Sequence, residues 1–181
     1  MHVFIDFEAS SLQKHSFPVE VGWVLEDGTG EGHLIRPAPH WTDWDPEAEA
    51  IHGLSRERLA AEGTAHDIVC DRLVDLFAGS SVYCSAPSWD GHWLSMLLRA
   101  SGRPRHLLRM RDTEELFAEA ARHRLGPDAS ADAIVALVEE ERDIAAALPV
   151  AHRAVVDARR EWSVWRAIVT GARPDLGLFS S

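Results

Sequence analysis

The sequence of 181 residues contains two cysteines, a single lysine and no long apolar run. Cys70 and Cys84 form neither a metal-ligand spacing nor a disulfide framework. No apolar stretch approaches the roughly 20 residues that a helix needs to cross a bilayer. The first residues lack a basic segment and reach an acid at Asp6, which argues against a signal peptide. These absences predict a cytoplasmic protein with no membrane partner.

A broad basic surface is also missing, because 29 acidic residues outnumber 18 basic ones and give a net charge of −11. Proteins that bind long duplex DNA normally present such a surface. One basic segment exists, since the thirteen positions from Arg99 to Arg111 hold no acidic residue. This segment is either a local nucleic-acid contact or an ordinary solvated helix end and loop.

Apolar periodicity predicts a mixed α/β chain. Strands are expected at 3–7, 19–25, 32–35, 82–85 and 107–111, with a hairpin at the Asp27-Gly28 turn between the second and third. A loop is expected at 40–47, and Ser55 predicts a short capped helix. Longer helices are expected at 66–77, 87–98, 113–123, 131–148 and 153–169. Residues 1–181 are therefore expected to form a single domain, with a mixed five-stranded sheet flanked by helices.

Two acids lie at the end of the first apolar strand. Asp6 and Glu8 occupy alternate positions, so their carboxylates share one face of an extended segment. They lie at the strand end where α/β sheets usually bind ligands. Oxygen ligands of this kind suit Mg²⁺ or Mn²⁺. An Asp-x-Glu pair is common by chance, so two solvated acids would also explain it.

Further candidates lie in the second half of the chain. Asp90 falls in the first turn of a helix after the fourth strand, where acids also serve as partners of the helix dipole. His152 and Asp157 form the rarer pattern His-x-Ala-x-x-Asp at the start of the last helix. A histidine titrates near neutral pH, as a general base requires. Ala154 and Ala158 share a helix face and would let this helix lie close to the sheet.

In this order and context, the five residues resemble the motifs of DEDD-type 3′-to-5′ exonucleases, in the DnaQ-like DEDDh branch with a histidine in the third motif. The segment 51–54, Ile-His-Gly-Leu, is similar to a stretch that lies beside the nucleotide in that family, and 18–22 is similar to its second strand. The resemblance covers nearly the whole chain. It implies an RNase H-like fold.

The resemblance also implies roles for the five residues in a two-metal hydrolysis. Asp6 would bridge two Mg²⁺ or Mn²⁺ ions, and Glu8 and Asp157 would help to hold the ion that carries the attacking water. Asp90 would support the second ion through water, and His152 would deprotonate the nucleophile. The expected metal ligands are thus Asp6, Glu8, Asp90 and Asp157, and with His152 they form the expected catalytic set.

The partner implied by the resemblance is the 3′ end of single-stranded DNA or short RNA, and compact family members are often homodimers. The expected substrate-binding residues are Ala9, Ser10, Ser11, Leu12, His52 and Trp89. The chain departs from the family where Ala9-Ser10-Ser11 replaces Thr-Thr-Gly and where 85–87 lacks the usual His-Asn-Ala. These departures affect substrate preference more than chemistry.

Seven tryptophans are available for stacking or for packing. Trp41 and Trp44 lie in the expected loop close to His52, and we expect them to stack on nucleic-acid bases. Three other tryptophans lie inside expected helices, and we expect them to pack in the core: Trp93, Trp162 and Trp165.

Three functions are compatible with this pattern. The first is a metal-dependent 3′-to-5′ exonuclease. The second is a catalytically silent nucleic-acid-binding or regulatory module with the same fold, and the third is a phosphodiesterase of small nucleotides. The complete set of four acids and one histidine favours an enzyme over a silent module. Substrate length would separate the two enzymes.

Overall fold

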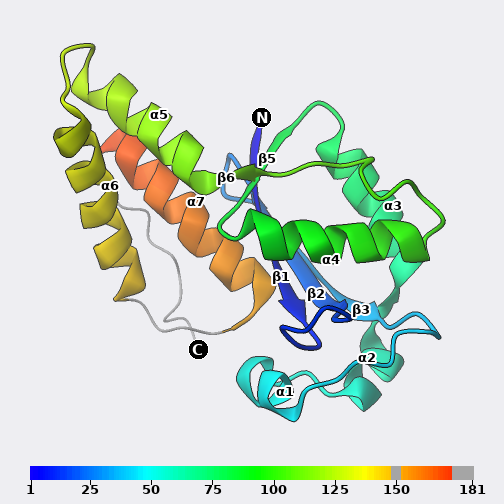
Figure 1. Ribbon diagram of the computed structural model, residues 1–181. Coiled ribbons are helices and arrows are strands. Elements are labelled where there is room, and N and C mark those ends of the chain that lie inside the picture. Colours follow the sequence, from blue (N-terminus) through cyan, green and yellow to red (C-terminus); the bar gives the residue numbers. More distant parts are fainter. Residues whose placement is uncertain (148–151, 173–181) are drawn as a thin grey trace.

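A computed structural model describes residues 1–147 and 152–172, which form a mixed sheet between helices (Figure 1). The six strands are β1 (His2–Ala9), β2 (Pro18–Leu25), β3 (Gly30–Arg36), β4 (Thr64–Ala65), β5 (Ser81–Cys84) and β6 (Arg111–Asp112). Their order in the sheet is β4-β3-β2-β1-β5-β6. β1 pairs with β2 antiparallel and with β5 parallel. The predicted mixed α/β fold and the hairpin between β2 and β3 are confirmed.

The prediction of five strands is wrong, because the sheet has six. The additional strand β4 pairs only Thr64 and Ala65 with the end of β3. Two residues are too few to produce a detectable alternation of apolar side chains. Strand β6 is also shorter than expected, since only Arg111 and Asp112 pair with β5 and the residues before them form a loop.

The helices are α1 (Pro46–His52), α2 (Arg56–Glu62), α3 (His66–Phe77), α4 (Pro87–Ala100), α5 (Thr113–Leu125), α6 (Ala131–Ala146) and α7 (Ala154–Thr170). The predicted helices are confirmed within a few residues, although Leu148, the expected end of α6, lies outside the described residues. Helix α1 was missed and overlaps the end of the expected loop. Its start carries clear signals, namely an Asp45 side chain that accepts from the Glu47 N–H and Pro46 in the first turn.

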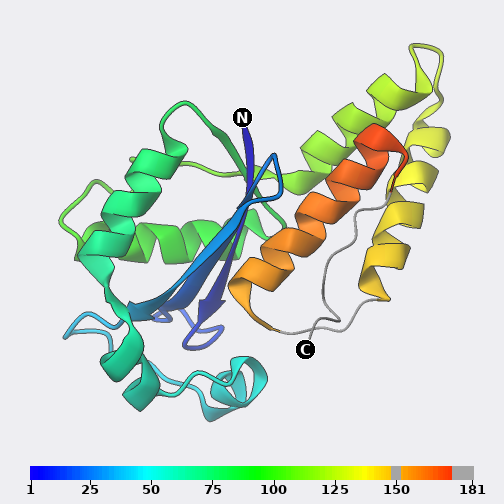
Figure 2. The same ribbon diagram turned by 180° about the vertical axis from the view of Figure 1, so that it is seen from behind.

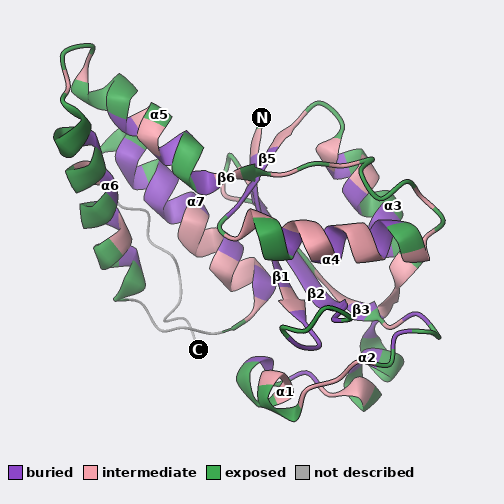
Figure 3. Cartoon of the chain, in the orientation of Figure 1, coloured by how far each residue is buried: buried purple, intermediate pink, exposed green. Residues whose placement is uncertain are grey.

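The sheet is covered by different helices on its two faces. Val3, Ile5 and Phe7 of β1 point toward the core with α3 and α4, whereas Phe4 points toward the core with α5 and α7. Figure 2 shows α7 along the second face, with α6 outside it, and Figure 3 shows that the outer side of α6 is largely exposed. Alternation along β1 therefore turns Asp6 and Glu8 toward the α7 side.

The first turn of α7 lies directly on the backbone of β2. A Cβ added at Gly22 would be 2.2 Å from Val155 N and 2.5 Å from Ala154 C. Ala154 and Ala158 are fully buried, which confirms that their small side chains let the helix approach the sheet. This close approach brings α7 to the acidic end of β1. No helix in the described part of the chain is long and apolar enough to span a membrane.

We predict that Gly22→Ala destabilises the protein, because the new methyl group meets backbone atoms that have no room to move. Overpacking of this kind typically costs about 1–3 kcal/mol, and more where backbone must shift. Urea unfolding measures the change.

The matched control is Gly32→Ala, since Gly32 pairs with Gly22 across the hairpin but its Cβ would meet its nearest atom, in the Val155 side chain, at 3.5 Å. Equal stability of the two variants would contradict the close backbone approach.

Candidate active site

A cleft of about 430 Å³ opens beside the carboxyl ends of β1 and β5. Residues from three separate parts of the chain line it, and they include all five members of the expected catalytic set: Asp6, Glu8, Asp90, His152 and Asp157. The structure therefore brings together side chains that are separated by up to about 150 positions in the sequence.

Three carboxylates converge within the cleft. Asp6, Glu8 and Asp157 each offer an oxygen, and the three oxygens lie within 4.8 Å of one another. Hard divalent cations such as Mg²⁺ and Mn²⁺ prefer oxygen ligands of this kind. The donor set therefore fits such a cation, and Asp90 lines the same cleft.

Burial and mutual repulsion raise the pKa values of these acids. Burial, with repulsion from Asp90 and Glu8, holds the pKa of Asp6 well above its usual range. Burial, reinforced by Asp157, raises the pKa of Glu8 to about 7. Burial also raises the pKa of Asp90 to about 7 and that of Asp157 above its ordinary value. A bound cation would relieve this repulsion, because it favours the ionised form of each carboxylate.

The start of α4 positions Asp90. Pro87 opens the helix, and the Asp90 carboxylate accepts a hydrogen bond from the Ala86 N–H at 3.3 Å. The side chain is only 1% exposed. Cys84, the last residue of β5, is buried nearby, and both burial and the charge of Asp90 raise the pKa of its thiol.

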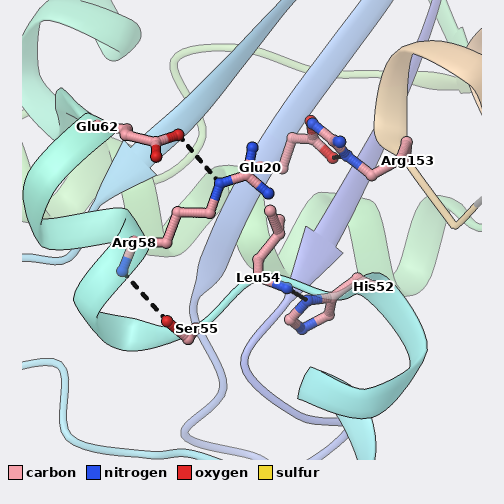
Figure 4. Close-up of polar contacts among 7 residues, drawn as sticks. All are labelled: Glu20, His52, Leu54, Ser55, Arg58, Glu62 and Arg153. Carbon is pink, nitrogen blue, oxygen red and sulfur yellow. Dashed lines mark hydrogen bonds and ion pairs between the residues drawn. The ribbon is translucent and has the colours of Figure 1, made fainter.

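An ion pair between the buried Glu20 and the partly exposed Arg153 fixes the chain next to His152 (Figure 4). The Glu20 carboxylate on β2 accepts hydrogen bonds from both Nε and Nη2 of Arg153, the shortest at 2.6 Å. It also accepts one from the Ala154 N–H at 3.1 Å. Glu20 therefore satisfies one of the free N–H groups at the start of α7. His152, the preceding residue, has φ 45°, a value that no other non-glycine residue shows in the described ranges. The anchored Arg153 thus holds His152 in a sparsely populated conformation at the cleft wall.

Two residues of the cleft were missed by the sequence reasoning. Glu161 lines the cleft and accepts from Thr113 Oγ1 at 2.8 Å, and burial raises its pKa. Arg160 also lines the cleft and donates to Asp157 Oδ1 at 2.9 Å. The spacing gave a signal, because residues three and four positions after Asp157 lie on the same helix face.

The expected substrate-binding residues divide into two groups. Leu12 and Trp89 line the cleft and are 65% and 39% exposed. The others lie outside the cleft lining and are buried: Ala9, Ser10, Ser11 and His52.

The buried hydroxyls before Leu12 have partners inside the protein. Ser10 and Ser11 both donate to Asp43, at 3.1 and 2.6 Å. His52 accepts from the Leu54 N–H through Nδ1 at 3.0 Å, as Figure 4 shows. These contacts hold the segment that carries Leu12 and the end of α1 in place.

The expectation that Trp41 stacks on bases is wrong. Its side chain is 3% exposed and stacks on the buried Phe17, with ring centroids 5.1 Å apart. The loop that holds it thus closes part of the core. Trp44 lies under the Arg56 guanidinium and donates to Glu49. The core positions expected of three other tryptophans are confirmed: Trp93, Trp162 and Trp165.

Comparisons with known proteins give structural matches alone. No protein-family model and no curated protein sequence matches the chain. It is similar to Escherichia coli exonuclease I in complex with a dT13 oligonucleotide, with a TM-score of 0.63, 16% identity, and coverage of 95% of this chain and 41% of that chain. It is also similar to the zinc-bound form of the complex of that enzyme with single-stranded DNA, with a TM-score of 0.64, 15% identity, and coverage of 93% and 39%.

A third match is a moderately thermophilic exonuclease I from Methylocaldum szegediense, with a TM-score of 0.64, 17% identity, and coverage of 94% and 41%. The chain has the fold of exonuclease I. The predicted RNase H-like fold is thereby confirmed, and the structural neighbours are DEDD-type exonucleases. The chain spans about two fifths of the length of these enzymes.

We predict that the metal-free protein loses stability as the pH rises from about 5 to 8. The raised pKa values mean that the folded state binds more protons than the unfolded chain between about pH 4 and 7, so unfolding becomes easier through that range. The melting temperature in EDTA measures the effect, at about 2–4 °C per kcal/mol for a chain of this size.

Added Mg²⁺ or Mn²⁺ should reverse the loss at pH 8, because it binds the ionised carboxylates. Asp90→Asn, which removes one buried charge, should raise the melting temperature at pH 8 more than at pH 5. A pH dependence identical to that of the unmodified protein would contradict the raised pKa of Asp90.

We also predict energetic coupling between Glu20 and Arg153. Arg153→Met should destabilise the protein by about 1–3 kcal/mol, because it leaves the buried Glu20 carboxylate without its charged partner. Combining it with Glu20→Gln should recover part of this loss, since the amide is neutral and can still accept from the Ala154 N–H. Urea unfolding of both single variants and the double variant measures the coupling. Strict additivity would show that the pair does not act as a unit.

Proposed function

We propose that the chain is a metal-dependent 3′-to-5′ exonuclease that hydrolyses phosphodiester bonds at the 3′ end of single-stranded DNA or short RNA. The observation that supports it is the convergence of Asp6, Glu8 and Asp157 within 4.8 Å, in a cleft that also holds Asp90 and His152. The structural neighbours include complexes with dT13 and dA16 oligonucleotides, which favours single-stranded DNA.

In this proposal the acids hold two Mg²⁺ or Mn²⁺ ions. Asp6, Glu8 and Asp157 contribute oxygens on one side of the cleft, and Asp90 contributes from the start of α4. When bound, a pair of such ions stabilises both the entering and the leaving oxygen of an in-line displacement.

His152 acts as the general base. Its side chain is exposed at the cleft wall, so it can reach a water molecule beside the scissile phosphate and accept its proton. The ion pair of Arg153 with Glu20 limits the movement of its backbone. His152 therefore needs little reorganisation before the proton moves.

Leu12 and Trp89 contact the terminal nucleotides at the cleft mouth. Both are exposed apolar side chains beside the acids, and an aromatic face accepts a stacked base of any identity. Ser10 and Ser11 hold the segment that carries Leu12 in place through their hydrogen bonds to Asp43. Ala9 and His52 are buried and support the nucleotide site without reaching the cleft.

The test uses single-stranded DNA and RNA labelled at the 5′ end and incubated with Mg²⁺, Mn²⁺ or EDTA. We expect a ladder that shortens from the 3′ end only when metal is present. Asp157→Asn should slow it by at least about a hundredfold, since even the outer partners of metal ligands typically contribute 10–100-fold. Asp132→Asn is the matched control, because Asp132 is an exposed acid on α6, outside the cleft.

Two other outcomes would identify a different function. Binding of oligonucleotides without any cleavage, with the fold intact and metal bound, would indicate a silent binding module. Cleavage restricted to dinucleotides would indicate a phosphodiesterase of small nucleotides.

A further inference from the structure

The basic segment from Arg99 to Arg111, most of which lies between α4 and β6, contains both arginines that form ion pairs and arginines that do not. Arg103 forms an ion pair with Asp71, and Arg111 forms one with Glu115 and lies over the Tyr83 ring. In the described part of the chain, no carboxylate forms an ion pair with Arg105 or Arg109. Both side chains are exposed.

These two arginines line a pocket of about 180 Å³. His106 lies between them in the sequence and accepts from Arg105 Nε at 2.6 Å, so both side chains lie at the same rim. Leu94, Leu108 and Met110 supply apolar walls. A cationic rim above apolar walls fits an anion that carries an organic group, such as a phosphodiester with its sugar or base.

The pocket and the catalytic cleft share the first two turns of α4. Pro87 and Gly91 face the pocket, whereas Trp89 and Asp90 face the cleft. At about 100° per residue Asp90 lies about 60° from Pro87 around the helix, whereas Trp89 lies on the opposite side from Pro87 and Gly91, across a helix about 10–12 Å wide. Figure 1 shows the segment after α4 running back along that helix toward β6.

Trp89 lies on the cleft side of these shared turns and is exposed. It is stacked on Trp93, with ring centroids 5.8 Å apart and an interplanar angle of 25°. Trp89 thus presents an exposed aromatic face, backed by the buried Trp93, on the helix that also lines the pocket. A single strand that leaves the cleft over Trp89 can reach Arg105 and Arg109 within a few nucleotides if it crosses α4, which is about 10–12 Å wide.

We propose that Arg105, His106 and Arg109 bind a backbone phosphate of the single strand a few nucleotides upstream of its 3′ end. This inference rests on the proposed exonuclease function and assigns that activity to oligonucleotides long enough to span both pockets. The arginines select strands over dinucleotides, because a dinucleotide occupies the cleft alone.

The test compares two double variants that each remove two positive charges. Arg105→Gln with Arg109→Gln removes the pocket cations. Arg122→Gln with Arg166→Gln removes exposed cations near the far ends of α5 and α7 (Figure 1). Binding of a labelled 12-nucleotide strand is measured in EDTA by fluorescence anisotropy across a range of salt concentrations, and cleavage is measured on strands of 2 to 12 nucleotides with Mg²⁺.

The pocket variant should bind the 12-nucleotide strand more weakly than the control variant. Its slope of log affinity against log salt should fall by about 0.7, because the pocket binds one phosphate and each phosphate contact to a single strand contributes about 0.7. Its cleavage of long strands should slow, while cleavage of dinucleotides stays unchanged. Equal slopes in the two double variants would overturn the proposal.

Inorganic phosphate and a free mononucleotide separate the strand from small anions. Either compound is added at a concentration equal to the dissociation constant of the 12-nucleotide strand. If it displaces the strand at that concentration, the pocket binds small anions as tightly as it binds the strand, and the proposal fails. The two proposals fail separately. Cleavage of the strand together with an unchanged salt slope in the pocket variant would support the exonuclease and overturn the phosphate site. A changed salt slope without any cleavage would support the phosphate site and overturn the exonuclease.

Discussion

The contact between the first turn of α7 and β2 determines where the chemistry of this fold can lie. Gly22 leaves space for the helix backbone, and Glu20 binds both Arg153 and the Ala154 N–H. Because this end of the helix is fixed, Asp157 reaches the acids of β1 from the other end of the chain. If α7 were displaced by even a few ångströms, Asp157 would be separated from Asp6 and Glu8, and the three carboxylates would no longer form one site.

The acids of the cleft lower the stability of the folded protein. Its acids are held close together and partly buried, which makes their ionised forms unfavourable until a cation is bound. The two apolar cores on either side of the sheet supply the stability that the cleft lacks. Functional sites commonly store strain of this kind, and the backbone of His152 is a second instance at the same place.

Local patterns in the sequence predicted the parts of this structure that depend on neighbouring residues. Alternation placed Asp6 and Glu8 on one face, and helical spacing placed Ala154 and Ala158 against the sheet. Two of the failures involve partners distant in sequence, whereas helix α1 was missed despite the local signals at Asp45 and Pro46. Trp41 packs on Phe17, and strand β4 exists only through its pairing with β3. Glu161 was within reach of the spacing argument, but its partner Thr113 lies in another helix.

Cys84 lies at the wall between the sheet and Asp90, fully buried, and its thiol is held in the protonated form by its surroundings. The thiolate is the form that oxidants and electrophiles attack. Cys70 is buried as well, and burial raises its pKa too. Both sulfur atoms are therefore poor targets, although one of them lies beside the acids that would hold metal. Neither cysteine therefore offers oxidants a reactive thiolate beside the cleft.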